Sequence, residues 1–287
     1  MSESRLQDSA EAKLYAIKLV DLEHKMIDSA FILPFRKYHI HNLELLRSKI
    51  KLKGDEYEGL EAVVIDENMV YFSVETTTPS DNCYLLRGII SDTAVILNSD
   101  FLMPMPKPVL PNGEHVYNAG FEALSLLQKN VYFAFFEFNY FHKYNDVCRI
   151  SPWSFTNHGK HNSLPISKLP FRITDITKTG KYKFTGINYF YKGDGADTVY
   201  RVPKSDTLND HLIRESSGYH SYCRLIDVKY NPSSFKFTWK PLWELPTAYW
   251  SYNWEGIAAY KEGYFIINDK YTSARPYSSV LLYLKER

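Results

Sequence analysis

The sequence predicts an all-β protein, more specifically a β-propeller with four-stranded antiparallel blades. Aromatic residues make up 16% of the chain, with 23 Tyr and 17 Phe, and there are 14 Pro and 13 Gly. This composition favours many short strands over long helices. A hairpin motif also recurs along the chain, and a third strand follows it at a nearly constant distance. Units of about 45–60 residues with four short strands are typical of propeller blades, whereas the strands of an ordinary β-sandwich would not keep such offsets.

The hairpin motif consists of an apolar strand, a short polar turn and a second apolar strand. Four copies occupy residues 57–75, 121–137, 173–188 and 254–269. Three copies carry a Glu near the start of the first strand, and the weaker third copy carries Thr174 there. Because the copies are in register, equivalent residues are expected at equivalent places in successive blades.

Third strands are expected to begin at Cys83, Cys148, Cys223 and Val280. They start 25, 26 and 25 residues after the motif Glu in the three strong copies, and 49 residues after Thr174 in the weak copy. A polar insertion near 194–217 accounts for the longer spacing. The three cysteines would lie on different blades, so we expect them to be reduced and buried.

Fourth strands are expected over 94–105, 164–171 and 235–242. Residues 1–12 form a polar N-terminal segment, and 13–287 are expected to form a single propeller domain. Within it, residues 14–19 resemble a third strand and 27–34 a fourth strand. These strands would either complete the C-terminal blade or remain from a truncated first blade. The second interpretation gives a five-bladed ring, and a six-bladed ring is the alternative if the insertion hides a blade.

The hairpins resemble a known family. The segments YEGLEAVVIDENMVYFSVE, GFEALSLLQKNVYFAFFEF and NWEGIAAYKEGYFIINDKY are similar to phytase-like propellers called "esterase-like activity of phytase" and to their SdiA-regulated relatives. The departing copy, RITDITKTGKYKFTGINYFYKGD, also looks like this group. The resemblance runs from about Leu14 to Lys285 and implies a β-propeller that bacteria often export, sometimes with bound calcium.

The motif carboxylates are candidate metal ligands. First strands line the central channel of a propeller, so Glu58, Glu122 and Glu255 are expected to converge near one axis, with Thr174 in the fourth place. The ends of the second strands supply a second expected set, Glu75, Glu137, Asn188 and Asp269. Acidic groups brought together repel one another unless protons or a cation neutralise them. Oxygen ligands suit Ca²⁺, although each Glu could instead cap backbone amides of the next blade or act directly in catalysis.

Other residues are candidates for ligand contact. Asn188, Lys270 and Trp254 are expected at the channel mouth, where a small molecule or a protein would bind. His39 and His41 share a strand face but lack a third ligand, so solvated histidines are the preferred interpretation. The sequence contains neither a G-x-S-x-G elbow nor a Walker loop.

Two functions are consistent with these patterns: a calcium-dependent hydrolase of esters or phosphoesters, and a non-catalytic binding module. The net charge of +1 argues against binding of nucleic acid or of an anionic membrane. No apolar run approaches the length of a transmembrane helix. We expect a monomer, located in the periplasm or on the cell surface if an upstream leader was removed and in the cytoplasm otherwise.

Overall fold

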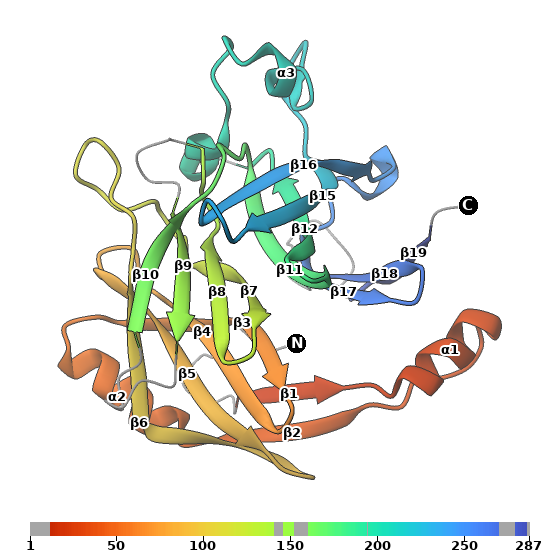
Figure 1. Cartoon of the computed structure of the whole chain (residues 1–287). Helices are drawn as coiled ribbons and strands as arrows, with labels where there is room; N and C mark the ends of the chain where they lie inside the picture. The colour runs from red at the N-terminus through yellow and green to blue at the C-terminus, as the bar shows by residue number, and fades with distance from the viewer. Residues whose placement is uncertain (1–11, 141–145, 152–159, 194, 270–278, 286–287) are drawn as a thin grey trace. The chain divides into compact units, whose positions relative to one another are not determined.

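A computed structural model describes residues 12–140, 146–151, 160–193, 195–269 and 279–285 (Figure 1). Strands make up 55% of the structure and helices 12%, so the predicted all-β class is confirmed. The contacts divide the chain into two compact units. We call the described residues up to Met105 the N-terminal unit and those from Pro106 onwards the C-terminal unit.

The N-terminal unit contains one six-stranded sheet with the order β1-β2-β6-β5-β4-β3. Its strands are β1 (Lys13–Ala16), β2 (Arg36–His41), β3 (Tyr57–Asp66), β4 (Met69–Thr76), β5 (Asn82–Ile90) and β6 (Ala94–Pro106). The first predicted repeat is therefore confirmed strand by strand as β3–β6. Helix α2 (Leu43–Leu52) contributes Leu46 and Ile50 to the core of this unit.

The prediction for the N-terminal strands was wrong in two respects. Residues 27–34 form no strand, because the chain forms helix α1 (Leu19–Ile27) and re-enters the sheet only at β2. The helix is favoured by Asp21 in its first turn and by Lys25 in its last, which complement the helix dipole. In addition, β2 pairs with β6 in parallel, so β1 and β2 extend the sheet of the first repeat.

The C-terminal unit contains three sheets that follow the predicted repeats. The first has the order β10-β9-β8-β7, the second β11-β12-β15-β16, and the third β17-β18-β19. Their strands are β7 (Phe121–Gln128), β8 (Val131–Phe136), β9 (Asp146–Ser151), β10 (Lys160–Pro165), β11 (Arg172–Gly180), β12 (Lys183–Phe190), β15 (Tyr222–Asn231), β16 (Lys236–Glu244), β17 (Trp254–Tyr260), β18 (Gly263–Asn268) and β19 (Leu281–Lys285).

One strand of this unit differs from its prediction. The fourth strand of the second repeat is β10, over 160–165, and not 164–171. Pro165 and Pro170 have no N–H to donate to a strand ladder, which explains why pairing ends early. Beyond Pro165 only single bridges remain, such as the one between Leu169 and Asn139.

The polar stretch at 194–217 lies between the second and third strands of its repeat. Its described part contains the short helices η1 (Gly195–Tyr200) and α3 (Thr207–Asp210) and strand β13 (Arg214–Glu215), which forms a small ribbon with β14 (Gly218–Tyr219) just after it. The ribbon is held by Arg214, which donates 2.6 and 2.7 Å hydrogen bonds to Asp210. We call residues 195–219 the insertion.

Aromatic side chains fill the core between the sheets of the C-terminal unit. Phe133 from β8 lies 4.8 Å from Phe184 on β12 and 5.0 Å from Phe237 on β16, measured between ring centroids. A second cluster joins Tyr189 and Leu225 to Trp254 and Ile266. The apolar faces of consecutive repeats in this unit thus pack against each other.

Consecutive first strands also lie side by side in this unit, with β11 in contact with both β7 and β17. The Thr174 hydroxyl donates a 2.6 Å hydrogen bond to the Trp254 carbonyl, and the Asp175 carboxylate accepts one of 2.7 Å from the Ile257 N–H. On the other side, the Ile173 N–H donates to the Glu137 carbonyl at 3.1 Å. The first two bonds join β11 to β17, and the third joins it to the residue that follows β8.

Two of the three cysteines have described side chains. Cys83 and Cys223 are buried and carry reduced thiols, as expected. Cys148 lies in β9, but its side chain is outside the described residues. No helix of the described chain is long and apolar enough to cross a membrane.

Candidate functional site

The motif position of every repeat coincides with a β-bulge. In the pairing of first and second strands, Glu58 falls between Tyr57 and Gly59, which pair with Thr76 and Glu75. Glu122, Thr174 and Glu255 are skipped in the same way in β7, β11 and β17. A bulged residue has no partner in the ladder, and bulges are a common means of re-aiming a side chain. The sequence repeat therefore corresponds to a repeated irregularity of the backbone.

The same hydrogen bond closes three of the four hairpins. The N–H of Thr77 donates to Glu56 at 2.9 Å, that of Glu137 to Gly120 at 3.0 Å, and that of Asp269 to Asn253 at 2.7 Å. These bonds show that Thr77, Glu137 and Asp269 are equivalent. Glu75 lies two residues before this position in its own repeat.

The residues predicted at the ends of the second strands therefore do not all occupy equivalent positions in their repeats. Asn188 pairs with Ile173 just as Asn268 pairs with Trp254, so Asn188 lies one residue before the place of Glu137 and Asp269. Side chains alternate along a strand, so a shift of one residue turns Asn188 to the opposite face. The repeat pattern did not reveal these shifts, because several neighbouring positions at the ends of the second strands carry an acidic or amide residue.

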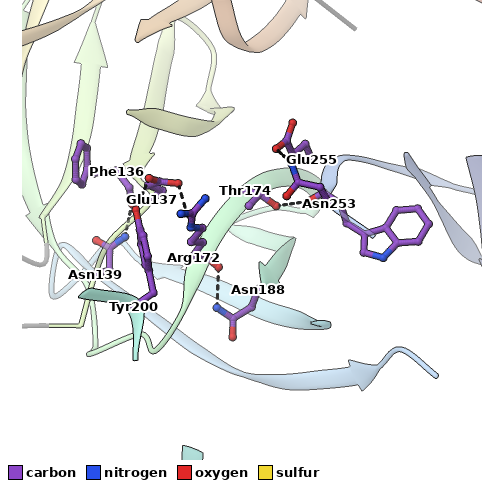
Figure 2. A network of polar contacts seen from close by, with 10 residues as sticks. Phe136, Glu137, Asn139, Arg172, Thr174, Asn188, Tyr200, Asn253 and Glu255 are labelled. Atoms are coloured by element: carbon purple, nitrogen blue, oxygen red, sulfur yellow. Dashed lines mark hydrogen bonds and ion pairs between the residues drawn. The ribbon is translucent and has the colours of Figure 1, made fainter. Parts of the chain in front are cut away.

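One part of the site is closed over by the insertion (Figure 2). The Tyr200 hydroxyl donates a hydrogen bond to Glu137, and both side chains are buried. The Arg172 guanidinium lies 4.2 Å from the Tyr200 ring centroid, with its Nε 3.9 Å from a Glu137 oxygen. Burial and the neighbouring Glu137 raise the pKa of Tyr200, so its hydroxyl stays protonated and donating.

Asn188 serves to position this group instead of facing a ligand. It is fully buried and donates hydrogen bonds to the carbonyls of Pro170 at 2.7 Å and Arg172 at 2.9 Å. Its side-chain oxygen accepts a 2.8 Å bond from Arg224 Nε. Asn188 thus fixes the backbone where β11 begins at Arg172.

The other part of the site, around Glu255, is open to solvent. The residue is exposed, and its carboxylate accepts a hydrogen bond from the Asn253 amide (Figure 2). Desolvation by the surrounding protein raises the pKa of Glu255 to about 8, and the charges of Asp269 and Glu137 act in the same direction. Arg172 and the Asn253 hydrogen bond oppose the shift.

Arg172 is therefore the local counter-charge for the acidic residues of this unit. It interacts with both Glu137 and Glu255, the closed and the open carboxylate. A nearby positive charge such as the Arg172 guanidinium stabilises the ionised form of a carboxylate, as a bound cation would. We call Glu137, Arg172, Tyr200, Asn253, Glu255 and Asp269 the polar site.

The described residues show no ready-made cluster of calcium ligands. Ca²⁺ takes 6–8 oxygen ligands, yet the described residues contain no group of three or more His, Cys, Asp or Glu that could hold a metal ion. Glu137 instead accepts from Tyr200 and faces Arg172. Glu58 and Glu75 belong to the N-terminal unit, whereas Glu122, Glu137, Glu255 and Asp269 belong to the C-terminal unit. Calcium binding by these residues stays a prediction.

Two of the residues predicted to contact a ligand at the channel mouth, Trp254 and Lys270, have different outcomes in the structure. Trp254 is completely buried, and its indole N–H donates to the Tyr249 carbonyl at 2.8 Å, so its ring packs in the core and offers no face to a ligand. Lys270 lies outside the described residues. Tyr200 and Asn253 were not predicted: Tyr200 comes from the insertion, which no repeat aligns, and Asn253 precedes the motif.

No family model matches the chain, and no curated protein matches it. The resemblance to phytase-like propellers rests on the hairpin motifs quoted above and stays a prediction.

Proposed function

We propose that the repeats are blades of a β-propeller. The proposal is supported by the common bulge and by the side-by-side first strands of the C-terminal unit. Four repeats supply four blade-like sheets, and a five-bladed ring needs one more than these. A crystal structure of the chain tests both the closure and the blade number.

We further propose that the polar site binds a small, uncharged polar molecule such as a sugar. The observation that carries this proposal is the grouping of the exposed Glu255 carboxyl with the Asn253 amide and the Asp269 carboxylate, and the raised pKa of Glu255 favours its protonated form near neutral pH. A protonated carboxyl donates a hydrogen bond, and the neighbouring Asn253 amide and Asp269 carboxylate supply further donors and acceptors. Such convergent polar groups fix the orientation of a small ligand.

A thermal-shift screen against mono- and disaccharides, sugar acids and amines at neutral pH tests the binding proposal. We expect neutral polyols to raise the melting temperature, because binding to the native state stabilises it. Glu255→Ala should abolish the shift, because a methyl group neither donates nor accepts a hydrogen bond, whereas Glu255→Gln should retain most of it, because the amide both donates and accepts as a protonated carboxyl does. The matched control is Glu262→Ala in the turn of the same hairpin, which should respond like the wild type. A shift that survives Glu255→Ala would overturn the assignment.

Hydrolysis of an ester or phosphoester is the second candidate, and the same raised pKa favours it. A carboxyl that is protonated at neutral pH can act as a general acid toward a leaving group. A screen with p-nitrophenyl acetate and p-nitrophenyl phosphate, with and without Ca²⁺, tests it. Turnover that requires Ca²⁺ and is lost in Glu255→Gln would support the hydrolase and contradict a purely binding role.

A further inference from the structure

The hairpin turns of the three repeats in the C-terminal unit lie at one end of their sheets. β11 and β17 run in the same direction, because Thr174 bonds to Trp254 and Thr177 accepts from the Ala259 N–H at 3.1 Å. β7 runs parallel to them, because Ile173 bonds to Glu137, which bonds to Gly120 just before β7, and Lys178 Nζ donates to the Leu127 carbonyl near the end of β7 at 3.1 Å. The turns at 129–130, 181–182 and 261–262 therefore share one end.

Two further segments reach the same end. Lys183 pairs with Lys229 across β12 and β15, and the turn that joins β15 to β16 follows two residues later, with Asn231 paired to Lys236. In the third sheet, Gly263 beside the hairpin turn pairs with Lys285. The end thus carries the tips of four turns and the last residue of β19.

Lysines dominate this end of the unit among the residues whose side chains are described. They are Lys129, Lys178, Lys181, Lys183, Lys229, Lys236, Lys261 and Lys285. All are exposed except the half-buried Lys236. The described acidic residues nearby are Glu262, 2.8 Å from Lys285, and Asp227, 3.5 Å from Lys229. The balance is strongly positive, and we call this surface the basic end.

Aromatic side chains accompany the lysines at the turn tips. Phe235 is 58% exposed and occupies a left-handed backbone position with φ of 51°, next to Lys236. Tyr182 occupies the tip of the β11–β12 turn, and its ring lies 5.6 Å from Lys181 Nζ and 5.7 Å from the Tyr230 ring. Tyr260 is followed by Lys261, just as Tyr182 is followed by Lys183. A large apolar ring held at the tip of a turn is expensive to leave in water.

We propose that the basic end is an adsorption surface for an anionic phospholipid bilayer. Lysine is a compact point charge suited to diffuse attraction toward many headgroups, whereas the planar guanidinium of arginine suits bidentate recognition of single phosphates. Phe235 enters the headgroup region, and the flanking lysines extend to the phosphates. Nucleic acid fits less well, because its single strands need aromatic faces free for stacking, and the Tyr182 ring packs on Tyr230.

The proposal is independent of the polar site and has its own test. Sedimentation with sucrose-loaded vesicles of phosphatidylcholine alone, or with about a third phosphatidylserine, measures binding of the full chain. We expect binding only to the anionic vesicles, and release as NaCl approaches about 1 M, where screening is nearly complete. The double variant Lys181→Glu, Lys183→Glu should reduce the apparent affinity by at least about tenfold.

The matched control is Lys192→Glu with Lys204→Glu, which makes the same change of charge at exposed positions outside the basic end. It should bind as the wild type does. Phe235→Ser should weaken binding at high salt more than at low salt, which separates insertion of the ring from attraction of the charges. The proposal is overturned if anionic vesicles do not sediment the protein. It is equally overturned if poly(U) or duplex DNA binds at the basic end in preference to vesicles.

Discussion

At the scale of single residues, a repeated position has no fixed role. Thr174 and Glu255 occupy the same bulge in neighbouring strands, yet Thr174 is buried and bonds to Trp254, whereas Glu255 is exposed. The bulge releases the side chain from the ladder, and the neighbours then decide what it does. Arg172 is the decisive neighbour in the C-terminal unit, because it is the positive charge that both carboxylates share.

Tyr200→Phe tests the closed part of the polar site. The change removes the hydroxyl that donates to Glu137 and leaves a buried carboxylate oxygen without that bond. We expect a loss of about 1–3 kcal/mol in the free energy of unfolding, measured in urea. Tyr191→Phe is the control, because Tyr191 is 40% exposed and should change stability little. Equal effects of the two variants would show that the Tyr200–Glu137 bond contributes nothing.

At the scale of elements, the hairpins depend on close contact between backbones. A Cβ at Gly263 would lie 2.2 Å from the Leu284 carbonyl oxygen in β19, which is a backbone atom and cannot turn away. Gly263→Ala should therefore cost about 1–3 kcal/mol, as overpacking does. Gly180→Ala, at the equivalent hairpin, meets no atom closer than 3.7 Å and should be nearly neutral. Thermal unfolding of both variants makes the comparison, and a neutral Gly263→Ala would contradict the pairing of β18 with β19.

The junction of β11 and β17 gives the protein a pH dependence. The Asp175 carboxylate bridges the strands by accepting from Ile257 and Ile176, and burial raises its pKa from 3.8 to about 7. Between these two values the folded state binds more protons than the unfolded state, so this group lowers stability as the pH rises toward 7. Asp175→Asn should flatten that part of the curve of unfolding free energy against pH. Asp92→Asn, at an exposed residue, should leave it unchanged, and parallel curves for Asp175→Asn and the wild type would contradict the raised pKa.

The hairpins were predictable from sequence because their signal is local. Alternating apolar strands around a two-residue turn need only neighbouring residues, and the third strands followed from a constant spacing. The helix α1 was missed because 14–34 is apolar enough to be read as strands. Arg172 and Tyr200 were not assigned to one site because their meeting depends on how the insertion folds back on β11, which no local pattern encodes.

At the scale of the whole molecule, the net charge of +1 conceals an uneven distribution. In the C-terminal unit the hairpin turns carry lysines, while Glu122, Glu137, Glu255 and Asp269 lie at the opposite ends of the strands. A balanced total therefore does not argue against an anionic partner, as the sequence analysis assumed. Electrostatic steering depends on the local potential and not on the sum of charges.

The proposed function depends most on the protonation of Glu255, and this can be measured directly. Carbon-13 NMR of side-chain carboxyl groups, from about pH 4 to about pH 10, follows each Glu through its titration. The resonance of Glu255 is assigned as the one that disappears in Glu255→Gln. We expect a midpoint near 8, because the protein around Glu255 and the charges of Asp269 and Glu137 raise its pKa to about 8. A midpoint near the ordinary value of 4.5 would mean that Glu255 is an ionised surface residue, and the polar site would lose the donor on which the proposed binding depends.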